Sequence, residues 1–281
     1  MREKIVTAAE AVQRIRDGDT VATGGFVGVG FAENIAVALE QRFTSTGLPR
    51  DLTLVYAAGQ GDGKLRGLNH FGHAGLVKRV IGGHWGLVPA LQKLAIDNQI
   101  EAYNLPQGVI SQLFRDTAAR KPGLLSSVGL GTFVDPRFGG GKINALARED
   151  VVSLMEIDGQ EYLFYKARPI HVAIIRGTSA DHAGNVTMEK EALTLEALAI
   201  AMAAHNSGGI VIVQVEQAVA NGTLNARQVK VPGILVDCVV VAERPEYHTQ
   251  TFGTSYSEAY ASAARVPLSA IAPMALCERK I

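Results

Sequence analysis

Short apolar runs alternate along this chain with longer segments in which apolar residues recur at helical spacing. Runs of roughly four to eight residues rich in valine, isoleucine and leucine predict buried strands, and apolar positions three or four residues apart predict amphipathic helices. The predicted strands begin at Thr20 and occupy 52–58, 76–81, 100–103, 172–175, 210–215 and 234–242. The predicted helices cover the apolar positions of 8–15, where a Thr7–Glu10 capping box opens the first helix, 35–43, 91–95, 110–114 and 193–204.

Strands separated by helices of this length pair in parallel, because a parallel connection has to cross over the sheet. The crossover helices then cover both faces of the sheet. The predicted fold class is therefore α/β, a doubly wound, open and mostly parallel sheet with helices on both faces. We expect one domain over 1–242, including a small hairpin of 152–157 and 161–165 around Asp158-Gly159.

The pattern of apolar and polar residues changes after residue 242. The segment up to Tyr260 is polar and aromatic with no clear period, which predicts a connector lying across a surface. A further helix is expected to begin at Pro273. We therefore treat 243–281 as a connector.

Composition narrows the function class. The 281 residues are 47% hydrophobic and 19% charged, and 27 basic residues balance 27 acidic ones, so no long-range field attracts nucleic acid or an anionic membrane. No stretch approaches the roughly 20 apolar residues of a membrane span, and no signal peptide opens the chain, so a cytoplasmic protein is expected. Cys238 and Cys277 lack metal or redox spacing and are expected to be buried free thiols.

Four glycines, Gly24, Gly25, Gly28 and Gly30, lie between a predicted strand and a predicted helix. Glycine lets a ligand approach the backbone closely, and the helix start behind the loop offers free N–H groups. A dinucleotide fingerprint fails because Glu33 stands where its third glycine belongs, and the Gly-Lys-Ser/Thr of a P-loop is absent. A tight turn without a ligand remains the plain alternative.

This loop resembles a known signature. Asp17-Gly18, a short apolar strand, Gly24-Gly25-Phe26 and Gly30 resemble the motif of family I CoA-transferases, although Thr23 replaces an aliphatic residue and Ala32 a proline. Other segments are similar to the N-terminal half of bacterial propionate and acetate CoA-transferases: Gly82–Gly86, Tyr103–Gly108, Gly131–Arg137, Glu161–Tyr165 and His205–Val211.

The resemblance implies transfer of CoA between short-chain carboxylic acids through an acyl anhydride and a glutamyl-CoA thioester. CoA and acyl-CoA would be substrates, with no permanently bound cofactor. It implies an oxyanion or orienting role for Gln107, although this residue could equally bond its own turn. The residues implied to bind substrate are Gly24, Gly25, Phe26, Val27, Gly28, Asn104, Gly108, Gly131 and Thr132.

The nucleophile is expected outside this chain. In the family it is a glutamate of the C-terminal half, and no segment here matches its glycine-rich context. Glu33 falls in the first turn of a helix, where a carboxylate complements the dipole, and neither Glu191 nor Glu216 has a better claim. We therefore expect an α-type half that depends on a β-type half within a higher oligomer. The tail 243–281 resembles the connector of fused enzymes and suggests a split, processed or truncated version of one, or an unusual two-gene arrangement.

Two further readings stay open. A non-catalytic module that binds a small ligand or acyl-CoA could use the same fold. A nicotinamide dehydrogenase lacks its fingerprint. A metal site is not expected, because His70, His73 and His84 provide one spaced pair without an adjacent acidic cluster.

Overall fold

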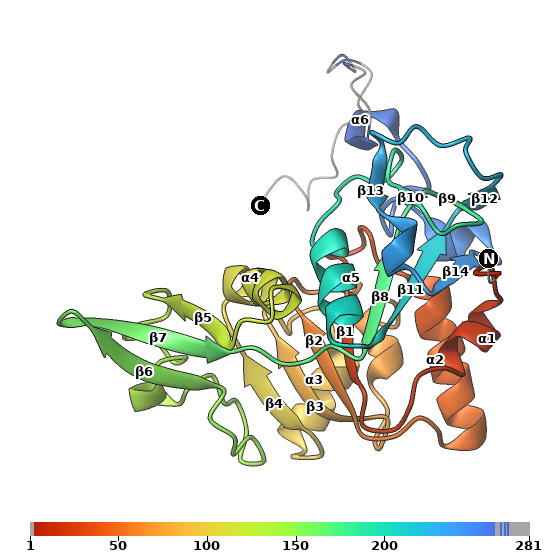
Figure 1. Ribbon diagram of the computed structural model, residues 1–281. Helices are drawn as coiled ribbons and strands as arrows, with labels where there is room; N and C mark the ends of the chain where they lie inside the picture. Colours follow the sequence, from red (N-terminus) through yellow and green to blue (C-terminus); the bar gives the residue numbers. More distant parts are fainter. Residues whose placement is uncertain (1–2, 262–264, 266, 268, 270–281) are drawn as a thin grey trace.

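The computed structural model describes residues 3–261 together with 265, 267 and 269. Its centre is a seven-stranded sheet in the order β14-β11-β8-β1-β2-β3-β4, and every neighbouring pair is parallel (Figure 1). The strands are β1 (Thr20–Thr23), β2 (Leu52–Tyr56), β3 (Val77–Gly82), β4 (Glu101–Asn104), β8 (Val172–Arg176), β11 (Ile210–Val215) and β14 (Cys238–Val241).

Helices cover both faces of this sheet and bury a separate apolar core on each. One core packs α1 (Ala8–Val12), α2 (Glu33–Thr46) and α3 (Pro89–Ile96) on the sheet. The other lies under α4 (Gln107–Ala118) and α5 (Ala197–Asn206), which pack side by side. The predicted doubly wound α/β class is confirmed, with a central sheet that is entirely rather than mostly parallel.

The strand order places a switch point beside β1. From β1 the chain proceeds outward through β2, β3 and β4, and it later returns to pair β8 on the other side of β1. In open α/β sheets the crevice at such a point, beyond the carboxyl ends of the strands, is where ligands bind. The glycine loop follows β1 directly and so lies at this position.

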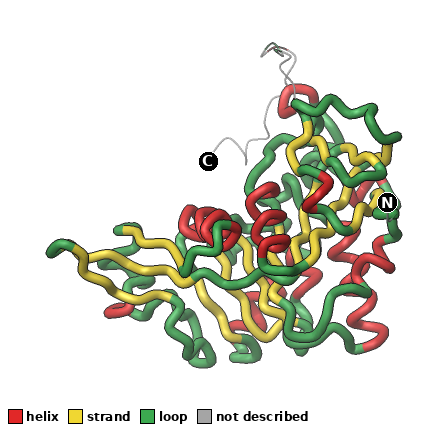
Figure 2. The backbone as a smooth tube through the Cα atoms, in the orientation of Figure 1, coloured by secondary structure: helices red, strands yellow, loops and turns green. Residues whose placement is uncertain are grey.

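Two smaller sheets complete the described part. One is an antiparallel arm of β5 (Gly123–Ser126), β7 (Gln160–Lys166) and β6 (Val152–Ile157). This arm projects from the body of the molecule (Figure 1 and Figure 2). The predicted hairpin is confirmed as its β6–β7 pair. The second sheet contains β12 (Gln217–Val219), β9 (Ser179–Asp181), β10 (Val186–Thr187) and β13 (Val229–Val231).

Several predicted boundaries were wrong, among them three that differ from the structure by three or four residues. Helix α5 starts at Ala197 instead of residue 193, because Leu195 has a φ of 49°, which is incompatible with a right-handed helix. Strand β14 starts at Cys238 because Pro232 opens a 3-10 turn, η3 (Gly233–Leu235). The capping box of α1 is present, but that helix ends at Val12.

The remaining short helices are η1 (Leu68–Phe71), η2 (Pro136–Phe138), η4 (Pro245–His248) and α6 (Glu258–Ala261). The last two belong to the connector, and the expected helix at Pro273 and the thiol of Cys277 lie outside the described residues. The division of the chain at residue 242 stays a prediction. Within the described ranges, no helix is long and apolar enough to cross a membrane.

Candidate active site

The glycine loop is joined to the strands on both sides of the switch point. The N–H of Gly24 donates to the carbonyl of Ile174 in β8 at 3.1 Å. On the β2 side, the N–H of Val27 donates to Gly59 O at 2.6 Å, and the N–H of Gly61 donates to Val27 O at 3.1 Å. The loop is therefore fixed between β8 and the segment that follows β2.

The tip of the loop is a tight turn with a strained residue. Phe26 and Val29 exchange two backbone hydrogen bonds of 2.9 Å, which leaves Val27 and Gly28 as the turn residues. Val27 has a φ of 54°, an unfavourable conformation for a β-branched residue that costs about 1–3 kcal/mol. Such strain persists only where the surrounding structure imposes it, and it concentrates at functional sites.

The turn determines which backbone donors are free. The N–H groups of Gly24, Phe26 and Val27 bond to carbonyls, whereas those of Gly25 and Gly28 have no partner among the described residues. By sequence alone, every residue from Gly25 to Gly28 could donate its N–H, because none of them is proline. The structure reduces this run to two N–H groups that could meet a developing oxyanion.

Gln60, which the sequence analysis did not single out, packs against the glycine loop and bonds the strand that precedes it. Gln60 is 1% exposed, and its side chain bonds Thr23 twice. A Cβ on Gly25 would lie 3.1 Å from Gln60 Cγ, so the loop packs directly on this amide. The available signal was a glutamine between Gly59 and Gly61, immediately after a buried strand.

Gln107 occupies the same edge of the sheet, at the first position of α4 after Pro106. Its side chain is exposed and makes no hydrogen bond to the described part of the chain, so the structure gives no support to a turn-bonding role. A Cβ on Gly83 would lie 3.0 Å from Gln107 Cα, which places this glutamine beside the loop after β3.

The glycine loop and the turn that carries Gln107 lie at the same edge of the sheet. The ends of β2 and β3 lie between them. The loops after β1, β2 and β3 each pack on the next one along the edge. Gly25 packs on Gln60, and a Cβ on Gly59 would lie 2.5 Å from His84 Nδ1. The glycines of these loops therefore let adjacent loops pack closely beyond the carboxyl ends of the strands. Gln107 lies at the β4 end of this row of loops, and the glycine loop lies at the β1 end.

The loop 129–141, which contains Gly131 and Thr132, lies beyond β4. The N–H of Asn104 donates to Gly141 O at 2.8 Å, which brings this loop beside the start of α4. Its polar groups serve the loop itself, because buried Asp135 accepts the N–H of Gly131 at 3.0 Å and the hydroxyl of Thr132 donates to Gly129 O at 2.7 Å. Gly108 faces open space.

The three glutamates considered from sequence all have structural partners. Glu33 is 4% exposed and accepts from the N–H of Gly67 at 3.0 Å and from Arg66 Nε at 3.3 Å, and its Oε1 lies 3.2 Å from His70 Nε2. Burial raises the pKa of Glu33, but the bonds to His70 and Gly67 outweigh burial and lower it. Glu191 pairs with Arg176 at 2.6 Å and Glu216 with Lys190 at 2.9 Å.

Two of the three histidines considered for a metal, His70 and His73, bond to carboxylates instead. His70 Nδ1 lies 2.5 Å from Glu40 Oε2, and His73 Nε2 lies 2.5 Å from Glu40 Oε1. In the described ranges, no group of three or more His, Cys, Asp or Glu residues has a geometry that could hold a metal ion. Two aromatic residues near this edge pack against the protein: Tyr103 is buried, and Trp85 meets Tyr56 edge to face.

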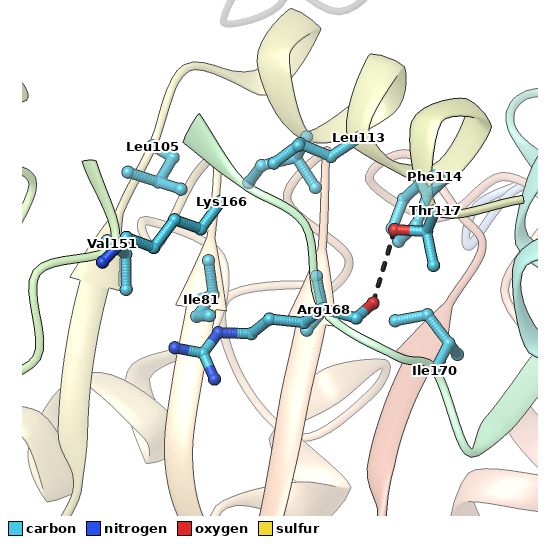
Figure 3. Close-up of a pocket in the computed structure, with 11 residues that line it drawn as sticks. Ile81, Leu105, Leu113, Phe114, Thr117, Val151, Lys166, Arg168 and Ile170 are labelled. Carbon is cyan, nitrogen blue, oxygen red and sulfur yellow. Dashed lines mark hydrogen bonds between the residues drawn. The ribbon is translucent and has the colours of Figure 1, made fainter. Parts of the chain in front are cut away.

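An apolar pocket beneath α4 is a different feature (Figure 3). Its cavity of about 30 Å³ has room for a water or two. The hydroxyl of Thr117 donates to Arg168 O at 3.3 Å across it, and neither the glycine loop nor Gln107 borders it. It results from the packing of α4 on the sheet. Its lining comprises Val55, Ile81, Leu105, Ile110, Leu113, Phe114, Thr117, Val151, Lys166, Arg168 and Ile170.

Comparison with known proteins agrees with the family that the loop motifs resemble. The family model for coenzyme A transferase matches residues 5–242. The chain is 47% identical over 278 residues to the caffeate CoA-transferase of Acetobacterium woodii, covering 99% of this chain and 53% of that protein. It is 44% identical over 241 residues to the acetate CoA-transferase YdiF of Escherichia coli K12, covering 85% and 45% respectively.

A solved structure extends the match to three dimensions. The acyl-CoA transferase of Escherichia coli O157:H7, in a thioester complex with CoA, superposes with a TM-score of 0.86 and 43% identity, covering 90% of this chain and 51% of that one. The chain thus spans about half the length of each of these three relatives. Because the family model covers most of its residues and its own motifs agree, this chain belongs to the family I coenzyme A transferases.

Proposed function

We propose that this chain supplies the α-type half of an enzyme that transfers CoA between short-chain carboxylic acids. The observation that carries the proposal is the strained Val27-Gly28 turn at the switch point, with the free N–H groups of Gly25 and Gly28. A related enzyme crystallised as a thioester complex with CoA supports the same chemistry.

The reaction would proceed in two exchanges. A glutamate carboxylate attacks the carbonyl carbon of acyl-CoA, the C–S bond breaks, and CoA thiolate leaves behind an acyl-glutamyl anhydride. The thiolate then attacks the glutamyl carbonyl, which gives the glutamyl-CoA thioester and releases the first acid. A second carboxylate reverses both steps and leaves as the new acyl-CoA.

Each attack places negative charge on a carbonyl oxygen. The N–H groups of Gly25 and Gly28 would stabilise this charge, and the amide of Gln107 would orient the carboxylate or oxygen at the same edge. Phe26, Val27 and Asn104 would shape the site, with Gly24, Gly108, Gly131 and Thr132 nearby. Chemistry of this kind needs no permanently bound cofactor.

The attacking glutamate would come from a β-type half, either a second polypeptide or a continuation of this one. The glutamates weighed from sequence support this, because each has a structural partner here. The caffeate CoA-transferase and YdiF are each about twice as long as this chain, which supports it as well. We further propose a cytoplasmic enzyme that assembles into a higher oligomer.

The test uses the complete enzyme, with acetyl-CoA and propionate as substrates. We expect propionyl-CoA to form, and borohydride added to the acyl-CoA incubation to label one glutamate in the β-type half, found by peptide mass spectrometry. Acyl-CoA binding without transfer or labelling would favour a non-catalytic module. Exchange at an enzymatic rate by the isolated 281-residue chain would overturn the dependence on a second half.

A further inference from the structure

The connector lies directly on the turn of the glycine loop. A Cβ on Gly28 would lie 2.5 Å from ring atoms of Phe252 and 2.7 Å from its backbone nitrogen. Gly28 does not have a positive φ, so its small size is required by this contact rather than by its backbone conformation. Phe252 thus packs on one side of the turn, while Gly59 and Gly61 bond Val27.

Arg66 holds the Phe252 ring in place. Its guanidinium lies 4.4 Å from the ring centroid, close enough for a cation–π contact. The same guanidinium donates to the carbonyl of Glu246 at 2.8 Å and to Glu33 at 3.3 Å. Since Glu33 starts α2, the helix behind the glycine loop, Arg66 ties the connector to this helix.

Buried polar side chains attach the rest of the connector to the same region. Arg176 donates to the carbonyl of Thr249 at 2.9 Å and to that of Phe31, at the end of the glycine loop, at 3.2 Å. Gln214 donates to Tyr247 O at 2.7 Å and accepts the N–H of Asn34 at 2.9 Å. Arg176 and Gln214 are 4% and 0% exposed, so each bridge is shielded from water.

We propose that Phe252 is a positioning residue and that the connector clamps the Val27-Gly28 turn. The strained turn is held by hydrogen bonds from the β2 side and by an aromatic ring from the connector side. Fixing it between them keeps the N–H of Gly28 at a constant position relative to Gly25. The catalytic consequence rests on the proposed CoA transfer, whereas the clamp itself is a property of the folded chain.

The test compares Phe252→Ala with wild type in the complete enzyme. We expect kcat to fall at least about 10-fold while KM for acyl-CoA changes less than about twofold, because misplaced donors affect the transition state more than substrate binding. Hydrogen exchange at the bonded amides of Val27, Val29 and Gly61 should accelerate at least about 10-fold. A merely structural role would not select these three amides.

Three variants complete the design. Phe252→Leu keeps an apolar side chain over Gly28 and should recover most of kcat and of the protection. Gly28→Ala keeps Phe252 but displaces it, so it should reproduce the local exchange of Phe252→Ala even if that variant fails to fold. Tyr256→Ala is the matched control, because it removes another aromatic side chain of the connector. The ring centroid of Tyr256 lies 5.6 Å from Lys190 Nζ. This variant should change neither kcat nor exchange at the turn.

The outcomes separate the two proposals. If wild type transfers CoA but exchange at the turn is unchanged in Phe252→Ala and Gly28→Ala, the clamp is refuted and the proposed function stands. If wild type transfers no CoA but these variants release the turn, the clamp stands and the proposed function fails. Equal effects of Phe252→Ala and Tyr256→Ala would also refute the clamp.

Discussion

Gln60 and Thr23 bond each other twice beneath the glycine loop. The hydroxyl of Thr23 donates to Gln60 Oε1 at 2.7 Å, and Gln60 Nε2 donates to the carbonyl of Thr23 at 3.1 Å. Thr23 stands where the family usually has an aliphatic residue, and this pair gives its hydroxyl a structural role.

We expect Thr23→Val to destabilise the protein by about 1–3 kcal/mol, because it leaves the buried Gln60 oxygen without its donor. The free energy of unfolding from denaturant titration measures the loss. Thr20→Val on the same strand is the matched control, since the Thr20 hydroxyl has no hydrogen-bond partner in the described part of the chain. Equal losses in the two variants would show that the Gln60 bond does not matter.

Glu191→Gln should cost about 3 kcal/mol at neutral pH, because it leaves the Arg176 charge buried without a counter-charge. Glu216→Gln breaks a half-exposed pair with Lys190 and should cost no more than about 1 kcal/mol. Thermal and denaturant unfolding of both variants checks the difference. A ranking in the opposite order would refute the role of burial.

The Arg176–Glu191 pair also predicts acid sensitivity. Burial raises the pKa of Glu191, but the charges of Arg176 and His248 outweigh burial and bring it to about 2. A lowered folded-state pKa gives stability that is present above about pH 4.5 and is lost as pH falls toward 2. Between pH 4.5 and 2 the free energy of unfolding should fall less in Glu191→Gln than in wild type. Parallel curves would contradict this.

His70 predicts an effect of the opposite sign. Burial lowers its pKa, but hydrogen bonds to Glu33 and Glu40 outweigh burial and raise the pKa above 6.5. A raised folded-state pKa gives stability that is complete below about pH 6.5 and is lost as pH rises through the folded-state value. His70→Gln should remove this decline in unfolding free energy on the alkaline side. NMR titration of the His70 ring with a pKa at or below 6.5 would contradict the prediction.

Gln107→Ala should lower kcat of the complete enzyme about 10²-fold and leave the melting temperature unchanged. The side chain is exposed and bonds no other described residue, so its loss should affect the reaction rather than the fold. Gln112→Ala on the same helix is the control and should keep full activity. A stability loss with normal activity would instead make Gln107 a structural turn residue.

The sequence by itself determined the layered α/β architecture, the hairpin and the position of the glycine loop. These features depend on local periodicity and on glycine placement, which the order of residues records directly. Local rules also explain why the start of α5 was missed: nothing near Leu195 in sequence indicates its left-handed conformation.

Tertiary structure alone decided which loop groups remain free and what holds them. In the described part of the chain, the N–H groups of Gly25 and Gly28 have no partner, whereas the N–H of Gly24 bonds β8 and the N–H of Val27 bonds the loop after β2. Gly28 is small because Phe252, far along the chain, packs on it. Such contacts join residues that are distant in sequence. No local pattern encodes which of these side chains will meet in the folded chain.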